Sequence, residues 1–432
     1  MAQPEGAGGD LAARVSTLRA QVRLLFDQNR QRGAAAWSDA RFDFVAPSSA
    51  HYPFQWLWDS CFHAVILAHL DPPRARSEIR TLLVNQHADG RISHMTLWER
   101  DQYEHALTHM ALQFTRSPYL SDISQTPVLA QALERLHELA PDQGFLEETL
   151  PQVVRFYRWW KDVRDPDNDD LVAIIQPDES GMDASPRYDR LMGLPADASD
   201  EDLFFRMGQL LGMLTDLRWD PARLWSEPPF LDEDVLVNAA FADGCASLER
   251  LCQAAGLNAG ADWAGKQARA TARALVAKCW DDEACCFWDL AGRGEEPQRV
   301  LTVAALVPIT CEGVPAEVVR RVVAVHLSPG SPMWPRFPVP SVSPGEPSFR
   351  PGAGPLWRGP SWMATNWLLW RGLRRHGYGE LARLLAARSL TMVETGGLRE
   401  YWDPFEGTGY GAEGFTWGAL VLDMLADEVA PA

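Results

Sequence analysis

Residues 11–30 read LAARVSTLRAQVRLLFDQNR, and their apolar positions recur every three to four residues. A spacing near 3.6 residues places such side chains on one face of an α-helix. Most of the other positions are polar, charged or small, as in a helix that buries one face. The segment therefore predicts an amphipathic helix whose buried face is formed by Leu11, Val15, Leu18, Val22 and Leu25.

The same spacing recurs along most of the 432 residues. It predicts further helices at residues 61–70, 73–86, 128–139, 149–163, 202–217, 233–255, 262–280, 315–325, 361–375, 378–393 and 415–427. Alternating strand-like patterns are few and short, as at Val172–Ile175. A long series of helices without βαβ alternation predicts an all-α fold.

Two helical packings fit this series, a solenoid and a ring of helical hairpins closed on itself. A solenoid should carry a repeated motif of fixed period, and no such motif is visible in the sequence. We therefore favour the closed ring, whose long loops gather at one end and can form a site there. We expect a single domain over residues 1–432, with the small and polar residues 1–10 disordered.

The bulk composition excludes several classes of partner. The formal net charge is −18, whereas a nucleic-acid binder needs basic surface to neutralise phosphates. We therefore expect neither a nucleic acid nor a membrane surface as partner. Residues 1–10 show no basic stretch leading into an apolar one, and no run of about 18 apolar residues occurs. These observations predict no signal peptide and no membrane span.

The cysteine content indicates the cellular compartment of the protein. They number seven, which is odd, and they form no pair of C-x-x-C motifs. This pattern predicts buried free thiols in a reducing environment rather than a disulfide framework or a zinc site. We therefore expect a cytoplasmic protein.

Tryptophan is unusually frequent, with 18 residues. Flat apolar rings with a polar edge suit the C–H faces of sugars. Any single tryptophan is better explained as a core residue, but a set of them near loops favours a carbohydrate site. The tryptophans in polar, loop-like contexts are Trp56, Trp58, Trp98, Trp357, Trp402 and Trp417.

A long segment at residues 328–360 is rich in proline and glycine. A loop of this length inside a compact domain is usually functional or disordered. Trp334, Phe337, Phe349 and Trp357 and the arginines at 336, 350 and 358 are set within it. We therefore expect an active-site loop or lid rather than a solvated linker.

Three segments place acidic residues beside aromatic residues or glycine. They are residues 54–60 (FQWLWDS), 176–187 (QPDESGMDASPR) and 396–404 (GGLREYWDP). Gly181 permits a tight turn that can aim Asp183 into a cleft. Asp59 either caps the helix that follows it or grips sugar hydroxyls as a carboxylate. Taken singly, the segments at 176–187 and 396–404 are better explained by ordinary capping and structural roles.

A fourth acidic segment, Asp165–Asp170, resembles the start of a calcium loop because oxygen ligands occupy alternate positions. The glycine expected at the sixth place is Asp170, and the glutamate expected at the twelfth is Gln176. We therefore interpret the segment as a solvated turn and expect no metal ion and no organic cofactor. The sequence also lacks H-E-x-x-H, P-loop, G-x-G-x-x-G and G-x-S-x-G motifs, which removes the commoner hydrolase and nucleotide-enzyme classes.

Together, these segments resemble the signatures of glycoside hydrolase family 63. The matching stretches are WLWDS at residues 56–60, ESGMDASPR at 179–187, PVPSVSP at 338–344, WRGPSW at 357–362 and EYWDP at 400–404. They follow the family's order between about residues 50 and 420. The greatest similarity is to bacterial glucosylglycerate and mannosylglycerate hydrolases.

The resemblance implies an (α/α)6 barrel with the site at its loop-rich end, and hydrolysis with inversion. It places Asp183 as the general acid and Glu400 as the general base, with Glu413 as the rival base. It also implies a sugar pocket lined by Trp58, Asp59, Gln86, Trp357, Arg358 and Trp417, to which we add Trp56, Glu179, Arg187, Trp402 and Glu413. An inverting pair of carboxyl groups lies about 6.5–9.5 Å apart, and the acid needs a raised pKa, for which Glu179 is a candidate neighbour.

The sequence also departs from the family. Ala184 and Tyr188 replace its usual asparagine and tryptophan, and residues 96–119 do not match the loop that holds glycerate in the relatives. A glycerate carboxylate would need a cationic partner, for which the candidates are Arg100, Arg187, Arg206 and Arg358. A trehalase-like or oligosaccharide α-glucosidase and a catalytically inactive sugar-binding barrel therefore remain as alternatives to a hydrolase of glucosylglycerate or mannosylglycerate.

Overall fold

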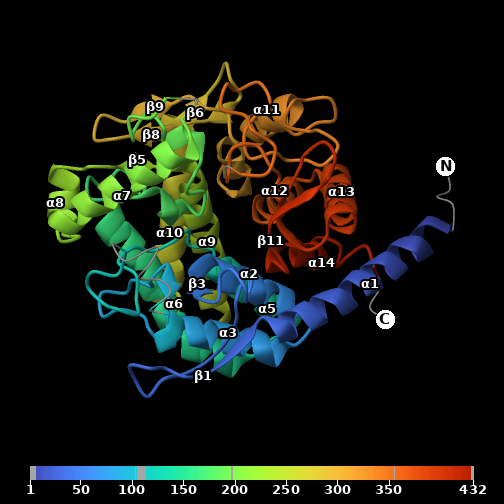
Figure 1. Cartoon of the computed structure of the whole chain (residues 1–432), viewed down its shortest axis with the longest axis horizontal. Helices are drawn as coiled ribbons and strands as arrows, with labels where there is room; N and C mark the ends of the chain where they lie inside the picture. The colour runs from blue at the N-terminus through green and yellow to red at the C-terminus, as the bar shows by residue number, and fades with distance from the viewer. Residues whose placement is uncertain (1–5, 103, 105–112, 196–197, 355, 430–432) are drawn as a thin grey trace.

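The computed structural model of the chain describes residues 6–102, 104, 113–195, 198–354 and 356–429, which Figure 1 draws in colour. The described residues are mostly helical, as the sequence predicts. The α-helices are α1 (Gly6–Gln28), α2 (Leu57–Ala68), α3 (Pro72–Leu83), α5 (Leu129–Leu139), α6 (Gln143–Arg164), α7 (Asp200–Asp216), α8 (Pro221–Ser226), α9 (Val235–Ala254), α10 (Asn258–Ala274), α11 (Ala316–His326), α12 (Met363–Arg375), α13 (Gly379–Gly396) and α14 (Val421–Met424).

Shorter elements connect these helices. The 3₁₀ segments are η2 (Pro177–Ser180), η3 (Pro186–Tyr188), η5 (Val303–Thr310) and η6 (Thr416–Leu420), and η4 (Leu275–Cys279) is a π-helical turn. The strands are β1 (Arg30–Ala34), β2 (Arg41–Val45), β3 (Gln55–Trp56), β4 (Met95–Thr96), β5 (Asp232–Glu233), β6 (Trp280–Asp281), β7 (Cys286–Phe287), β8 (Asp289–Ala291), β9 (Glu296–Gln298), β10 (Arg399–Trp402) and β11 (Gly409–Glu413). They pair as small antiparallel sheets, ordered β1-β2, β3-β4, β5-β8-β9, β6-β7 and β10-β11.

An inner layer includes elements that are buried on nearly all sides. Every residue of α2 and of η5 is buried, because both segments are apolar around most of their circumference. The contacts of this layer close on themselves: α2 packs on α5, α5 on α9, α9 on η5, η5 on α12, α12 on η6, and η6 on α2.

An outer layer packs on these inner elements. Helix α3 contacts α2, α6 and α10 contact α9, α11 contacts η5, α13 contacts α12, and α1 contacts η6 and α14. These helices are amphipathic, as the sequence predicts: α1 buries Val15, Leu18, Val22 and Leu25 and leaves the intervening polar residues outside. In Figure 1 this helix runs along the side of the molecule that carries α14.

Several boundaries differ from the prediction. Helix α1 already begins at Gly6, whereas residues 1–10 were expected to be disordered; residues 1–5 lie outside the described part. Helix α2 begins at Leu57 rather than residue 61, so Asp59 lies inside the helix and its side chain does not cap it. The segment expected to be helical at 415–427 is divided into η6 and α14. The uniformly apolar η5 went unpredicted because it has no helical period.

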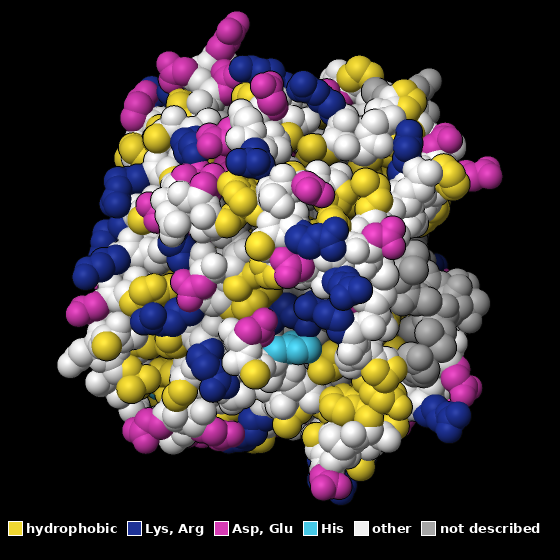
Figure 2. Space-filling model, turned by 90° about the vertical axis from the view of Figure 1, so that its left-hand side faces the viewer, with side chains coloured by type: hydrophobic (Ala, Val, Ile, Leu, Met, Phe, Trp, Pro, Cys, Tyr) yellow, Lys and Arg dark blue, Asp and Glu magenta, His cyan; other side chains and the backbone are white. Residues whose placement is uncertain are grey.

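Figure 2 shows acidic, basic and apolar side chains interspersed over one face of the molecule. The charge of −18 is therefore not gathered into one patch on that face. Within the part of the chain that the structure describes, no helix combines the length and apolar character needed to cross a bilayer.

The proline- and glycine-rich residues 328–360 form part of the packed structure, with residue 355 outside the described part. Backbone hydrogen bonds tie them to η5 (Val303 N to Ser341 O, 3.0 Å) and to the strand β10 region (Phe337 N to Pro404 O, 2.9 Å). The side chain of Phe337 is buried in the main core. The segment is therefore fixed at several points along its length, and it carries Trp357 to the wall of a cavity.

Candidate active site

A two-chambered cavity lies beside the ends of α2 and η6, where the long loops gather. One chamber, called the inner chamber because residues of α2 and η6 line it, has a volume of about 760 Å³. It is lined by Pro47, Tyr52, Trp56, Trp58, Asp59, His94, Gln125, Asp178, Gly181, Asp183, Leu356, Trp357, Trp362, Glu400, Phe415 and Trp417. The outer chamber holds about 1720 Å³ and is lined in part by α7, through Leu203, Phe204, Met207 and Leu211. Tyr52, Asp178, Asp183, Leu356 and Glu400 line both chambers, so the two predicted catalytic carboxyl groups lie at their junction.

The turn that presents Asp183 is built from local sequence. Gln176 caps η2, and the helix ends at Gly181, which has φ of +73°. A Cβ atom on this residue would lie 2.3 Å from Cζ2 of Trp58, so only glycine fits both the backbone conformation and the contact. The sequence prediction of a tight turn at Gly181 is confirmed.

The surroundings of Asp183 favour its protonated form. Burial, followed by the nearby charge of Asp178, raises the pKa of Asp183 to about 8. The Trp357 indole donates a hydrogen bond to this carboxyl group and lowers the pKa only slightly in comparison. A carboxylic acid that keeps its proton near neutral pH can act as a proton donor.

Glu400 comes from β10, which pairs with β11, and it reaches the cavity from another segment of the chain. Its Oε2 accepts a hydrogen bond from the Ala412 backbone N–H at 2.9 Å, and its Oε1 accepts one from the Tyr52 hydroxyl at 3.2 Å. Burial raises the pKa of Glu400, and these two hydrogen bonds oppose that effect. Glu400 therefore combines a raised pKa with two donors that stabilise its ionised form.

Aromatic side chains form the wall of the inner chamber. Trp357 stacks on Trp362 with ring centroids 3.9 Å apart, and Trp58 meets Trp417 edge-on at 5.0 Å. The Trp417 indole N–H also donates to Oδ1 of Asp59 at 2.7 Å. Burial raises the pKa of Asp59 to about 7. The chamber therefore offers apolar ring faces with a few polar groups between them, which is the usual composition of a sugar site.

Sequence reasoning missed several lining residues. Tyr52, His94, Gln125 and Asp178 all reach the cavity. Burial lowers the pKa of His94 to about 3, so the imidazole is neutral. Asp178 was visible within the acidic segment 176–187, but the spacing alone did not show that it, rather than Glu179, is the charge beside Asp183. The other three come from segments that carry no motif of their own.

Comparison with known proteins identifies the family of this chain. A family model described as the mannosylglycerate hydrolase MGH1-like glycoside hydrolase domain matches residues 52–418. The chain belongs to this family.

Three relatives illustrate the similarity. A mannosylglycerate hydrolase of Thermus thermophilus is 31% identical over 89% of this chain and 96% of its own length. The glucosylglycerate hydrolase of Mycolicibacterium hassiacum is 29% identical over 87% of this chain and 92% of its own. A crystal structure of the family 63 mannosylglycerate hydrolase from a second strain of Thermus thermophilus, in complex with Tris and D-glycerate, superposes with a TM-score of 0.81 at 29% identity and covers 95% of this chain and all of that one. This chain is therefore a glycoside hydrolase that acts on a small glycoside.

Of the residues that the sequence assigned to the site, Trp56, Trp58, Asp59, Asp183, Trp357, Glu400 and Trp417 line the inner chamber of this glycoside hydrolase. Trp402 is buried behind it, and its indole donates to Gly397 O at 3.2 Å. Gln86 lies away from the cavity and donates to the Gly90 and Gln152 carbonyls. Glu413 sits on β11 with an exposed side chain that pairs with Arg399. The structure therefore does not bring these last two to the site.

Three further predicted residues form buried ion pairs behind the cavity. Glu179 accepts from Arg164 at 2.5 Å, so the raised pKa of Asp183 has a different neighbour as its cause. Arg187 lies between Asp234 and Asp289 at 2.7 and 3.0 Å, and Arg358 pairs with Asp189 at 2.6 Å. These arginines hold the surrounding loops and do not line the cavity. The other predicted cationic partners, Arg100 and Arg206, are exposed.

Proposed function

We propose that this enzyme hydrolyses the α-glycosidic bond of a mannosylglycerate or glucosylglycerate with inversion of the anomeric centre. The observation that carries the proposal is the placement of Asp183 and Glu400 at the junction of the two chambers. The inner chamber then takes the sugar ring, and the outer chamber takes the leaving group.

In this mechanism Asp183 is the general acid. It donates its proton to the glycosidic oxygen as the bond from that oxygen to the anomeric carbon breaks. The raised pKa of about 8 keeps that proton in place at neutral pH. The Trp357 indole hydrogen bond holds the carboxyl group against the tryptophan wall.

Glu400 is the general base. It accepts a proton from a water molecule whose oxygen attacks the anomeric carbon on the face opposite to the leaving group. The products are the β-anomer of the sugar and the free leaving-group alcohol, with Asp183 ionised and Glu400 protonated; both return to their starting state by proton exchange with water. Tyr52 and the Ala412 N–H support the ionised form that this role requires.

We also propose that the helices form an (α/α)6 barrel. The closed series of inner contacts, with one or two outer helices on each of α2, α9, η5, α12 and η6, supports this architecture. The seven buried free cysteines support a reducing compartment such as the cytoplasm.

The identity of the leaving group is supported mainly by the relatives. Among the described residues, no lysine or arginine lines the outer chamber, and a glycerate carboxylate would meet His51, Gln113 and backbone groups there. Residues 103 and 105–112 belong to the segment 96–119, whose sequence does not match the glycerate loop of the relatives, and they lie outside the described part. A trehalase-like or oligosaccharide α-glucosidase is the alternative, and it shares the acid and the base.

The test is a substrate panel of mannosylglycerate, glucosylglycerate, trehalose, kojibiose and maltose, with the anomer of the released sugar followed by proton NMR. We expect the β-anomer from one of the two glycerates, and loss of at least ~100-fold in kcat for Asp183→Asn and Glu400→Gln. Glu413→Gln is the matched control, because this exposed carboxylate lies away from the cavity. Release of the α-anomer, or loss of activity in Glu413→Gln in place of Glu400→Gln, would overturn the assignment. Cleavage of trehalose or maltose alone would support the alternative substrate.

A further inference from the structure

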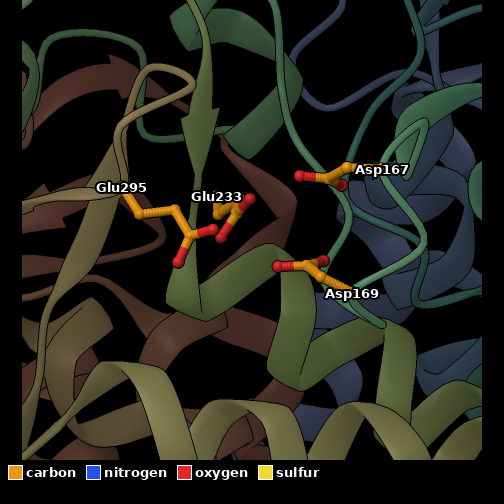
Figure 3. A group of neighbouring side chains, drawn as sticks. All are labelled: Asp167, Asp169, Glu233 and Glu295. Carbon is orange, nitrogen blue, oxygen red and sulfur yellow. The ribbon is translucent and has the colours of Figure 1, made fainter.

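A second group of acidic side chains gathers outside the catalytic cavity. Asp167 and Asp169 lie in the turn after α6, Glu233 lies on β5, and Glu295 lies in the turn between β8 and β9. One carboxylate oxygen from each lies within 4.8 Å of those of the other three. Figure 3 shows the four side chains converging from these three segments on a common space.

Glu233 is buried, unlike the carboxylates of an ordinary acidic surface cluster. Its side chain is only 5% exposed, and its Oε2 is buried without a hydrogen-bond partner. Burial of a carboxylate oxygen without a partner costs free energy, because the oxygen loses its hydrogen bonds to water and forms no others. In Figure 3 this carboxylate points toward the other three, so the missing partner belongs in the space between them.

The nearby positive charge is too small for the cluster. Lys278 contacts Asp169 and Glu295, the latter at 2.9 Å. Among the described residues, Lys278 is the one cation paired with these four carboxylates. Four ionised carboxylates beside one lysine leave an excess of negative charge. An added cation would remove that excess.

We propose that one calcium ion binds among four carboxylates, those of Asp167, Asp169, Glu233 and Glu295. The ligands are all hard oxygens, which favours calcium or magnesium over zinc or copper. Calcium bonds of 2.3–2.6 Å place opposite oxygens about 4.6–5.2 Å apart, whereas magnesium bonds of about 2.1 Å require about 4.2 Å. The four oxygens lie within 4.8 Å of one another, which is inside the calcium range. Four carboxylates also suit calcium, because magnesium usually keeps several waters and binds through one or two carboxylates. Asp167 is exposed, so the ion has a route from solvent.

This proposal differs from the interpretation of residues 165–170 as a solvated turn. Asp165 is buried and accepts from the backbone N–H groups of Asp169 and Asp170 at 3.1 and 3.0 Å, so it shapes the turn and is not available as a ligand. The acidic ligands expected from a continuous loop come instead from β5 and the β8–β9 turn, which sequence spacing does not reveal.

The ion would brace the segment that leads to the active site. After the turn, Ile174 exchanges two backbone hydrogen bonds with Asp232, at 2.8 and 3.1 Å. The chain then continues directly into η2 and the turn at Gly181. A cation joining Asp167 and Asp169 to Glu233 would fix both sides of this bridge. This inference does not rest on the proposed function.

The test measures calcium binding to the full-length enzyme after treatment with a chelator. We expect calcium chloride to give a binding heat in titration calorimetry and to raise Tm by about 3–5 °C at a hundredfold excess over Kd. Magnesium chloride should give a smaller shift, and sodium chloride of equal ionic strength none. A wild-type protein with no binding heat and no shift in Tm would overturn the proposal and leave Lys278 as the cluster's own counter-ion. A larger shift with magnesium than with calcium would overturn the choice of ion.

Two variants locate the site. Glu233→Gln should lose the calcium shift, whereas Glu296→Gln should keep it, because Glu296 is an exposed neighbour outside the cluster. If Glu233→Gln does not fold, Asp167→Asn replaces it, since this side chain is exposed; we expect a loss of affinity of tenfold or more. An unchanged calcium Kd in the cluster variants, or its loss in Glu296→Gln, would refute the assignment.

Discussion

Replacing Tyr52 with phenylalanine tests the role of Glu400 through its pKa. The Tyr52 hydroxyl donates to Oε1 of Glu400 at 3.2 Å and is one of two hydrogen bonds to that carboxylate. Burial and the charge of Glu400 raise the pKa of Tyr52, so the hydroxyl stays protonated and acts as donor. A hydrogen bond to the ionised form lowers the pKa of the acceptor. Its removal therefore raises the pKa of Glu400.

The size of the effect follows from the geometry. Hydrogen bonds to charged groups contribute about 1.5–3 kcal/mol, and this one is long, so we take about 1 kcal/mol. At about 1.36 kcal/mol per pKa unit, the pKa of Glu400 should rise by ~0.7. A base must be ionised to act, so activity is present above this pKa and is lost below it. The acid limb of the profile of kcat/KM against pH should therefore move upward by ~0.7 in Tyr52→Phe.

The assay is a pH series of initial rates for the wild type, Tyr52→Phe and Tyr410→Phe. The Tyr410 side chain lies on β11 and makes no hydrogen bond to Glu400 within the described structure, so its variant controls for the loss of a hydroxyl group. An acid limb that stays in place in Tyr52→Phe, or a shift confined to the alkaline limb, would refute the assignment of Glu400 as the base.

Three other predictions concern the acid, the glycine turn and a buried ion pair. Activity should fall above about pH 8, as Asp183 loses its proton. Asp178→Asn should move this alkaline limb of the pH profile downward by up to ~1 unit, because a like charge that opposes the ionisation of Asp183 is removed. An upward shift of the limb, or no shift, would contradict the role of Asp178. Gly181→Ala should lower Tm and kcat/KM, because its Cβ would lie 2.3 Å from Trp58. Chemical denaturation should show a loss of about 1–3 kcal/mol in the free energy of unfolding. Gly256→Ala is the control, because Gly256 also has a positive φ (+71°) but open space around it, so its free energy of unfolding should fall by less. Arg187→Met should lose about 3–5 kcal/mol of unfolding free energy by leaving two buried aspartates without their cation, whereas the exposed Arg320→Met should leave the urea midpoint unchanged.

Much of this molecule was predictable from local sequence. Helical periodicity identified α1, α5, α9 and α13 to within a few residues at most ends, because an amphipathic helix must repeat its apolar positions every 3.6 residues. Gly181 identified its turn, because a positive φ next to a crowded ring leaves little choice of residue. The clustering of tryptophans near loops indicated a sugar site before any contact was known.

The environment of each carboxyl group was decided by the tertiary structure alone. Sequence placed Asp178 and Glu179 side by side, but only packing sends Glu179 to Arg164 and leaves Asp178 beside Asp183. In the same way, Glu413 and Glu400 lie on paired strands, yet Glu413 faces Arg399 at the surface. Burial and the nearest charge set a pKa, and both depend on residues that are distant in the chain. Sequence therefore determined which chemistry was available, and the fold determined which residues can perform it.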